Sequence, residues 1–396
     1  MHEINQGCLD GIIVLDVGQA YQGPYAGFLC AREGATVIKI EPKGGDQARN
    51  RSSVSRGASL PFAILNANKK SLALDLKSEE GREVFLQLVS KADVLIENFA
   101  PGVMDRLGLG WNVLRQKNTR LIYGSATGYG LNGENRDNLA MDLIVQAHSG
   151  LASLTGMPDT PPVKAGGAVA DIIGGIHLFA GLMTALQARH QGGKGRLVEV
   201  AMVEALIPVL ISTMGLVQGG AQSRKKSGNK HAGFAVAPWN AYECSDGWVA
   251  IVCVSDRHWS LLSNAMGAPE FVEDPRFKTN KDRVMNMDML DEAVTNWTKA
   301  KKCSEVVEKL AKERLPVASY RTIEDVLNDQ ALRERKFLLD VEHPELGKFV
   351  TFDSPIKIHD SKRPPWVPSR KLGADARDVL SNILNYSEEE IESFLQ

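Results

Sequence analysis

The chain has 396 residues, a formal net charge of −2, 43% hydrophobic residues and 24% charged residues. This composition is typical of globular proteins, and the length suffices for two domains. The near-neutral charge gives no indication of a nucleic-acid partner or an anionic membrane surface, so an anionic ligand would need a local cluster of Lys and Arg.

The cysteines and the N-terminus indicate the compartment. Five cysteines are scattered without a C-x-x-C pair, which argues against a zinc site or a disulfide framework and fits a reducing environment. The first residues show no signal or transit pattern. The longest apolar run, about 172–186, is shorter than the ~20 residues of a membrane span and contains His177. We expect a cytoplasmic protein with no membrane partner, and the isolated histidines predict no metal site.

The first two hundred residues alternate between strand and helix patterns. Helices are predicted near 24–34, 78–92 and 139–149, and apolar runs predict strands at 12–17, 36–41, 71–77, 94–97, 121–126 and 197–202. This order predicts an α/β fold with an open, mostly parallel sheet covered by helices on both faces. Such sheets bind ligands beyond the carboxyl ends of their strands.

The loop after the first strand argues against a dinucleotide site. It reads GQAYQGP at 18–24, which is not the G-x-G-x-x-G pattern. Pro24 also stands where a pyrophosphate cradle would need a backbone N–H. We therefore do not assign Glu41, at the end of the next strand, to a nicotinamide ribose.

One carboxylate, Asp171, stands at the start of the longest apolar helical pattern, which runs to about His190. Free N–H groups and the helix dipole favour negative charge there, so the commonest interpretation of Asp171 is an N-cap. The alternative is a carboxylate held ionised in apolar surroundings as a nucleophile. The local pattern alone leaves both interpretations open.

Composition changes near residue 218. Residues 219–230 are polar, basic and Gly-containing, as in a linker. Strands at 239–243 and 248–254, followed by helices near 257–265, 287–298 and 304–313, predict a smaller α+β domain. We place a large domain at 1–218, the small domain at 219–330 and a C-terminal segment at 331–396, which ends in a helix with a capping box of Ser387 and Glu390.

Cations gather in loops near strand ends. Lys43 follows the second strand, Lys69 and Lys70 precede the third, and Arg106 comes one turn after the loop that follows the fourth. Together with the backbone N–H groups of these loops, they would suit a ligand with several phosphates.

Several spaced motifs resemble the family III CoA-transferases, which include formyl-CoA transferase and carnitine CoA-transferase. The resemblance extends from about residue 9 to 215, weakens through the small domain, where DPRF at 274–277 still matches, and returns at Leu372-Gly373. The matching stretches include ATVIKIEPKGGD at 35–46, NANKKSLALDLKSEEG at 66–81, ADVLIENFAPG at 92–102, SATGYG at 125–130 and the Asp171 segment.

The resemblance implies a fold and a reaction. The fold would be a Rossmann-like large domain built from both chain ends, a smaller domain between them, and two identical subunits interlocked as a homodimer. Asp171 would attack an acyl-CoA thioester, giving an aspartyl anhydride and then an aspartyl-CoA thioester, from which an acceptor acid takes the CoA. One thioester replaces another, so neither ATP nor a permanently bound cofactor is expected. By analogy, the donor would be succinyl-CoA or acetyl-CoA and the acceptor a small dicarboxylic acid.

The resemblance also assigns residues to CoA and to the acyl pocket. CoA contacts fall on Lys43, Lys69, Lys70, Leu74, Asn98, Phe99, Arg106, Thr127 and Tyr129. The substrate pocket falls on Tyr21, Gln22, Met141, Gly233 and Phe234.

Two departures bear on the substrate. Tyr21 occupies the position of a Gln in formyl-CoA transferase, with Gln22 beside it, and HAGF at 231–234 stands where that enzyme has four glycines. Both changes touch the acyl pocket, so formate and oxalate are not the expected substrates. The same fold carries 2-methylacyl-CoA racemases, which need a His as second base. Met141 holds that position and cannot take a proton, so the transferase is favoured and the racemase is the alternative.

Overall fold

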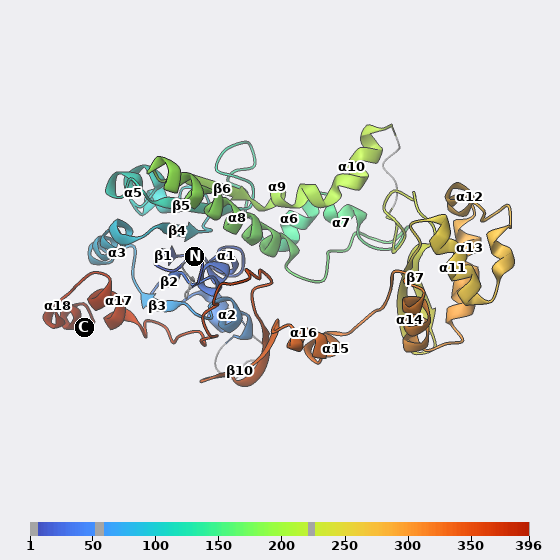
Figure 1. Ribbon diagram of the computed structural model, residues 1–396. Coiled ribbons are helices and arrows are strands. Elements are labelled where there is room, and N and C mark those ends of the chain that lie inside the picture. The colour runs from blue at the N-terminus through green and yellow to red at the C-terminus, as the bar shows by residue number, and fades with distance from the viewer. Residues whose placement is uncertain (1–6, 52–58, 221–225, 396) are drawn as a thin grey trace. The chain divides into compact units, whose positions relative to one another are not determined.

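The computed structural model describes residues 7–51, 59–220 and 226–395, and its contacts divide the chain into two compact units (Figure 1). The first unit comprises 1–149, 166–208 and 330–396, and the second comprises 150–165 and 209–329. This division differs from the predicted boundaries in two segments, 150–165 and 209–218, which were predicted to belong to the large domain and group with the second unit. The predicted linker at 219–230 lies partly outside the described residues.

The first unit is built on a six-stranded parallel sheet in the order β3-β2-β1-β4-β5-β6. Its strands are β1 Ile13–Asp16, β2 Thr36–Glu41, β3 Lys70–Ala73, β4 Val94–Glu97, β5 Ile122–Thr127 and β6 Leu197–Ala201. Because helices cover both faces of such a sheet, most of its strands are largely apolar, which is why the sequence located them. The predicted α/β fold with a mostly parallel sheet is confirmed. The strand order reverses between β1 and β4, and this is where doubly wound folds bind ligands.

Alternate strand residues face two apolar layers. On one face, Val14 and Ile96 pack with α1 Gln22–Arg32 and α8 Val169–Gly192. On the other, Leu15 and Leu95 pack with residues of α3 Glu79–Lys91, α5 Trp111–Lys117, α17 Ala376–Asn382 and α18 Glu388–Leu395. The remaining helices described in this unit are η1 Gln47–Asn50, α2 Leu60–Leu65, α4 Val103–Arg106, α6 Asp142–His148, α9 Met202–Leu206 and α16 Gln330–Glu334, and η2 Ile207–Leu210 spans the boundary with the second unit.

The C-terminal segment returns to this sheet. The Asp375 carboxylate accepts a hydrogen bond from the Ser71 N–H at 2.8 Å, and Arg32 pairs with Asp353 at 2.7 Å. The segment also contains an antiparallel hairpin, β10 Leu338–His343 with β11 Gly347–Phe352, which the sequence analysis missed. The predicted capping box is confirmed, because the Ser387 N–H donates to Glu390 Oε2 at 2.7 Å and the Glu390 N–H donates to Ser387 Oγ at 3.4 Å.

The second unit contains an antiparallel sheet of β7 Trp239–Cys244, β8 Gly247–Val252 and β9 Val317–Ser319. Its core gathers around Trp259, Phe271 and Phe277. Its helices are α7 Leu151–Leu154, α10 Ile211–Gln218, α11 Asp256–Met266, η3 Pro269–Val272, α12 Asn280–Met285, α13 Met287–Thr298, α14 Cys303–Lys312 and α15 Ile323–Leu327.

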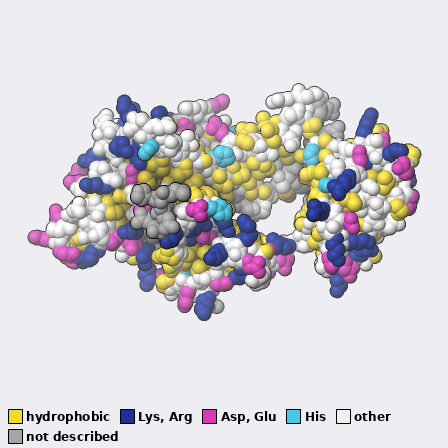
Figure 2. Space-filling view, viewed as in Figure 1, with side chains coloured by type: hydrophobic (Ala, Val, Ile, Leu, Met, Phe, Trp, Pro, Cys, Tyr) yellow, Lys and Arg dark blue, Asp and Glu magenta, His cyan; other side chains and the backbone are white. Residues whose placement is uncertain are grey.

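The helix α8 is unusually apolar for its length. Among the described residues it is the one helix long and apolar enough to cross a membrane, a test that core helices of globular proteins also pass. Here α8 packs against α1, β5 and β6. Hydrophobic side chains gather on the surface of the first unit around α8 and α9 (Figure 2).

Candidate active site

Asp171 is the third residue of α8, and its position corrects the N-cap interpretation. The residue before the helix is Ala168, which has no side-chain cap. The cap comes instead from Asp142, the first residue of α6: its Oδ2 accepts hydrogen bonds from the N–H groups of Ala170 at 2.7 Å and Asp171 at 3.3 Å. Asp171 therefore does not cap its helix with its own side chain.

The Asp171 carboxylate is half-buried and poorly stabilised. Burial, together with the neighbouring negative charge of Asp142, raises its pKa to about 6. Among the described residues, the structure records no cation or hydrogen-bond donor paired with this carboxylate. A carboxylate with such a pKa is ionised at neutral pH yet more basic than a solvated one, which favours nucleophilic attack.

The loop after β1 reaches the helix that carries Asp171. Gln22, the first residue of α1, is only 2% exposed. A Cβ atom at Gly174 would lie 2.6 Å from Gln22 Nε2, so this approach requires a glycine. Tyr21 and Ile172, the residue after Asp171, both pack against the cluster of Tyr25 and Phe28.

Of the predicted pocket residues, the structure brings three toward the start of α8. Tyr21 and Gln22 approach from the first loop, and Met141, 57% exposed, directly precedes Asp142. Gly233 and Phe234 belong to the second unit, where the Gly233 N–H donates to His231 Nδ1 at 3.1 Å. Their assignment to the acyl pocket stays a prediction.

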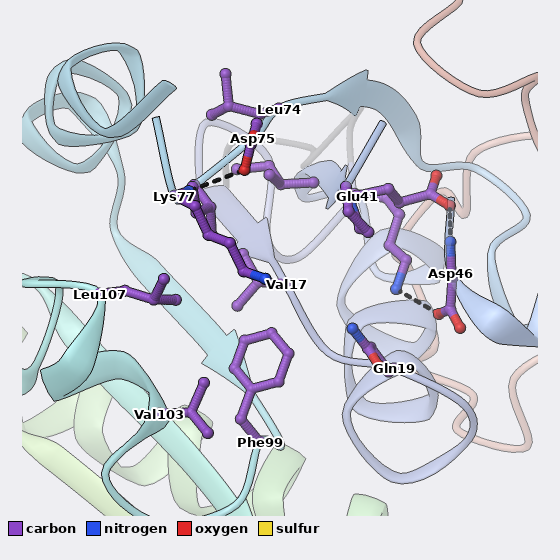
Figure 3. A pocket seen from close by; sticks show the side chains of 14 residues that line it. Val17, Gln19, Glu41, Asp46, Leu74, Asp75, Lys77, Phe99, Val103 and Leu107 are labelled. Atoms are coloured by element: carbon purple, nitrogen blue, oxygen red, sulfur yellow. Dashed lines mark hydrogen bonds and ion pairs between the residues drawn. The ribbon is translucent and has the colours of Figure 1, made fainter. Parts of the chain in front are cut away.

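An apolar slot lies at the carboxyl ends of β1 to β4. It has a volume of about 290 Å³, and Phe99 projects into it opposite Leu74 (Figure 3). Both residues were predicted to contact CoA. Its other lining residues include Val17, Gln19, Glu41, Asp46, Asp75, Lys77, Val103 and Leu107. A mostly apolar concavity with a few polar groups at a switch point is the usual form of a ligand site.

Two guanidinium groups converge beside this slot. A Cβ atom at Gly102 would lie 3.2 Å from Arg106 Nη1 and 3.6 Å from Arg136 Nη2. The nearest carboxylate oxygen to Arg136 is that of Asp137 at 3.8 Å, and the structure records no partner for Arg106 among the described residues. Arg136 lies in an irregular loop and was missed by the sequence analysis. Lys43, another predicted CoA contact, is exposed in the loop after β2.

The structure gives Lys69 a role different from the predicted phosphate contact. Lys69 is 3% exposed, and its ammonium group donates to Asp16 Oδ2 at 2.6 Å, to the Pro24 carbonyl at 2.9 Å and to Asn66 Oδ1 at 3.0 Å. Burial lowers the pKa of Lys69 to about 8, and the opposing attraction of Asp16 only partly compensates. An ammonium group that is buried among three internal hydrogen-bond acceptors stabilises the fold, and its charge is not exposed to a ligand.

Four other predicted CoA contacts also make contacts within the protein. Lys70 forms an ion pair with Asp378. Asn98 Oδ1 accepts from the Gln19 N–H at 2.6 Å, and its Nδ2 donates to the Gln19 carbonyl at 2.9 Å. Thr127 Oγ1 accepts from the Gly130 N–H at 2.8 Å, and Tyr129 packs edge-on against His148 at 5.1 Å. Any contact of these four with CoA stays a prediction.

No group of three or more His, Cys, Asp or Glu side chains suited to a metal ion occurs within 7–51, 59–220 and 226–395.

The fold and these residues define an α/β protein with a ligand site at the carboxyl ends of its parallel strands. The model of CoA-transferase family III matches residues 9–376. An acetyl-CoA:oxalate CoA-transferase of Acetobacter aceti is 35% identical, with 89% of this chain and 90% of that protein covered. A succinyl-CoA:mesaconate CoA-transferase of Haloarcula hispanica is 34% identical, covering 91% and 92%. The crystal structure of a CaiB/BaiF family protein from Brucella suis superposes with a TM-score of 0.86 at 32% identity, covering 96% and 100%.

The chain belongs to CoA-transferase family III, as its motifs indicated. It is an enzyme of that family, and the relatives named above act on acyl-CoA donors and carboxylic acids.

Proposed function

We propose that this enzyme moves CoA from an acyl-CoA donor to a small carboxylic acid through covalent intermediates on Asp171. The observation that carries the proposal is a half-buried carboxylate at the start of α8 whose pKa is raised to about 6. Such a group combines nucleophilicity with ionisation at neutral pH.

The chemistry proceeds by exchange at carbonyl carbons. An Asp171 oxygen attacks the donor thioester carbonyl, the C–S bond breaks, and an acyl-aspartyl anhydride and CoA thiolate result. The thiolate attacks the aspartyl carbonyl, which releases the donor acid and leaves an aspartyl-CoA thioester. The acceptor carboxylate attacks that thioester, and the released thiolate then attacks the acceptor carbonyl of the new anhydride. Acceptor-CoA departs and the Asp171 carboxylate is restored.

The same region supports binding of the CoA moiety. The apolar slot with Leu74 and Phe99 suits the adenine ring or the pantetheine chain. Arg106 and Arg136 would bind the phosphate oxygens of CoA, because guanidinium groups bind phosphate through paired charge-assisted hydrogen bonds. Lys43, in the loop after β2, would add a third positive charge.

The relatives guide the choice of substrates. Acetyl-CoA and oxalate, and succinyl-CoA and mesaconate, are the pairs in the names of two of them. We therefore propose acetyl-CoA or succinyl-CoA as donor and a small dicarboxylate as acceptor. A mass-spectrometric screen of the purified protein against such pairs tests the proposal, and the absence of any new acyl-CoA would contradict it.

A racemase is the second candidate and has less support. Met141 stands at the position matched to the racemase's second base and offers no proton acceptor. Incubation with a branched acyl-CoA in deuterated water, without an acceptor acid, distinguishes the two. Deuterium at the α-carbon would favour the racemase, whereas the transferase should incorporate none.

The pKa of Asp171 predicts an acid limit to the reaction. As pH falls through about 6, the nucleophile becomes protonated, so single-turnover acylation should slow about tenfold per pH unit well below that value. Asp142→Asn removes the neighbouring charge and keeps an oxygen that can cap α8, so the acid limb should move to lower pH. A pH–rate profile checks this, and an acid limb at the same pH in both proteins would contradict the assignment.

We also propose a homodimer. Apolar side chains around the start of α6 remain exposed in the single chain, with Leu139 85% exposed and Met141, Leu143 and Ile144 about half exposed. Monomers rarely expose such contiguous patches. A second copy covering this face would produce a dimer at nanomolar concentration, measurable by mass photometry. A folded monomer at that concentration would contradict the proposal.

A further inference from the structure

We infer that the side-chain amide of Gln22 donates a hydrogen bond to the carbonyl oxygen of the acyl group on Asp171, and that Lys39, Lys69 and Asn98 are positioning residues that hold Gln22 in place. This inference rests on the proposed covalent role of Asp171. It gives Lys69 and Asn98 a role other than the CoA contacts predicted from the sequence.

The first observation is a buried donor without an acceptor. Gln22 is 2% exposed, and its Nε2 has no hydrogen-bond partner among the described residues. Buried amide groups are almost always paired, because leaving one unpaired is unfavourable. An oxygen supplied by a bound ligand would satisfy this donor.

The second observation is the place of that donor. Gln22 Nε2 lies 2.6 Å from the Cβ position of Gly174, and the Gln22 carbonyl oxygen lies 2.7 Å from that of Gly175. Residues three and four positions apart share a helix face, so Gln22 approaches the face of α8 that carries Asp171, one turn away. Cβ bonds lean toward the helix N-terminus, so the space over Gly174 opens toward Asp171.

The third observation is that the backbone is held on both sides of Gln22, at Gly18 and Gln19 before it and at Pro24 after it, by side chains from other elements. Lys39 donates to the Gly18 carbonyl, and Asn98 accepts from the Gln19 N–H and donates to its carbonyl. Lys69 donates to the Pro24 carbonyl at 2.9 Å. Gln22 therefore lies between anchored points.

The two lysines are themselves held. Lys39 pairs with Asp46 at 3.0 Å, Lys69 pairs with Asp16 at 2.6 Å, and all four side chains are buried. Asp16 Oδ1 also accepts from the Gly18 N–H at 2.9 Å. A segment fixed before the substrate arrives can present a donor without reorganisation during the reaction.

These observations imply an effect on rate more than on binding. Negative charge develops on the acyl carbonyl oxygen as the Asp171 carboxylate attacks it, and a preorganised donor stabilises that charge more than the ground-state carbonyl. Loss of one such donor lowers kcat by roughly a hundredfold or more in the known examples of oxyanion stabilisation.

The test compares kcat and KM in variants of the full-length enzyme. Gln22→Met keeps the length of the side chain and removes the donor, and we expect kcat to fall about a hundredfold while KM for acyl-CoA changes little. Asn98→Ala releases Gln19, and we expect a fall in kcat of about tenfold, also with little change in KM. If Asn98 instead contacts CoA, KM rises and kcat is preserved, which overturns its positioning role.

Asn118→Ala is the matched control. Asn118 also holds two backbone carbonyls, those of Val89 and Ala92, both at 2.8 Å, but at the amino ends of the strands. We expect this variant to lower the thermal midpoint without changing kcat. An equal fall in kcat in this variant would show that general loosening explains the Asn98 result and would overturn the inference.

Hydroxylamine trapping separates this inference from the proposed function. If wild-type enzyme incubated with acyl-CoA gives no adduct on Asp171, the covalent mechanism fails and the inference fails with it. If wild type forms the adduct and Gln22→Met forms it equally fast, only the role of Gln22 is overturned. Much slower adduct formation in Gln22→Met supports the inference, and Asn98→Ala provides the same comparison should Gln22→Met not fold.

Discussion

Asp171→Asn is expected to abolish CoA transfer while leaving the fold and CoA binding intact. An amide cannot form the anhydride, so turnover should fall by at least about 10⁴-fold, the scale seen when a covalent nucleophile is removed. The fold should survive because the hydrogen bonds at the start of α8 come from Asp142, which this substitution leaves in place. The new side chain has nearly the same shape and carries no charge to bury.

The measurement pairs steady-state transfer with thermal unfolding and CoA binding by calorimetry. Glu389→Gln, a carboxylate-to-amide change at an exposed position on α18, is the control and should keep normal activity. Peptide mapping after acyl-CoA and hydroxylamine should place a single adduct on Asp171 in the wild type. Near-normal transfer by Asp171→Asn would mean that the carboxylate is structural after all.

The parallel sheet could be predicted from the sequence because a strand that is buried on both faces is apolar along most of its length. Most strands of the parallel sheet are short, largely apolar runs bounded by turn residues, and no distant contact is needed to recognise them. The β10–β11 hairpin, by contrast, contains no such apolar run. Its strands mix apolar and charged residues, as in LLDVEH at 338–343, and its place depends on packing with α1, where Phe352 meets Phe28.

The site was predicted unevenly for the same reason. Asp171 stood out because a long apolar helix follows it directly. Asp142 did not, since the amide groups that it caps lie 28 and 29 positions later in the chain. Lys69 was identified as a cation near a strand end, but whether its ammonium group reaches solvent depends on Asp16, 53 positions earlier. Charge can be read from sequence, whereas the partner of a charge is set by the fold.

Arg136 shows the same limit. It belongs to an irregular stretch between β5 and α6 that has no periodic pattern. Its nearness to Arg106 is seen only in the structure, where both guanidinium groups approach Gly102. Two guanidinium groups that converge keep like charges together at a cost, which the Asp137 carboxylate, 3.8 Å from Arg136, offsets only in part, and a bound phosphate would offset it further.

The double variant Arg106→Met/Arg136→Met is accordingly expected to raise KM for acyl-CoA about a hundredfold with kcat nearly unchanged. A hydrogen bond to a charged group contributes about 1.5–3 kcal/mol, and because Arg106 is exposed and Arg136 partly exposed, each is placed near the lower limit, about tenfold per residue. Each single variant should therefore raise KM about tenfold, and the wild-type KM should rise with added salt more steeply than that of the double variant.

Steady-state kinetics at two salt concentrations check this prediction, with Arg115→Met on α5 as the control. Arg115 is also exposed but lies on the helix that precedes β5, away from the carboxyl ends of the strands, so its replacement should leave KM and its salt dependence unchanged. An unchanged KM in the double variant would place the CoA phosphates elsewhere, with Lys43 the next residue to replace. A fall in kcat with KM preserved would instead mean that the two arginines act on the reacting groups and not on the phosphates.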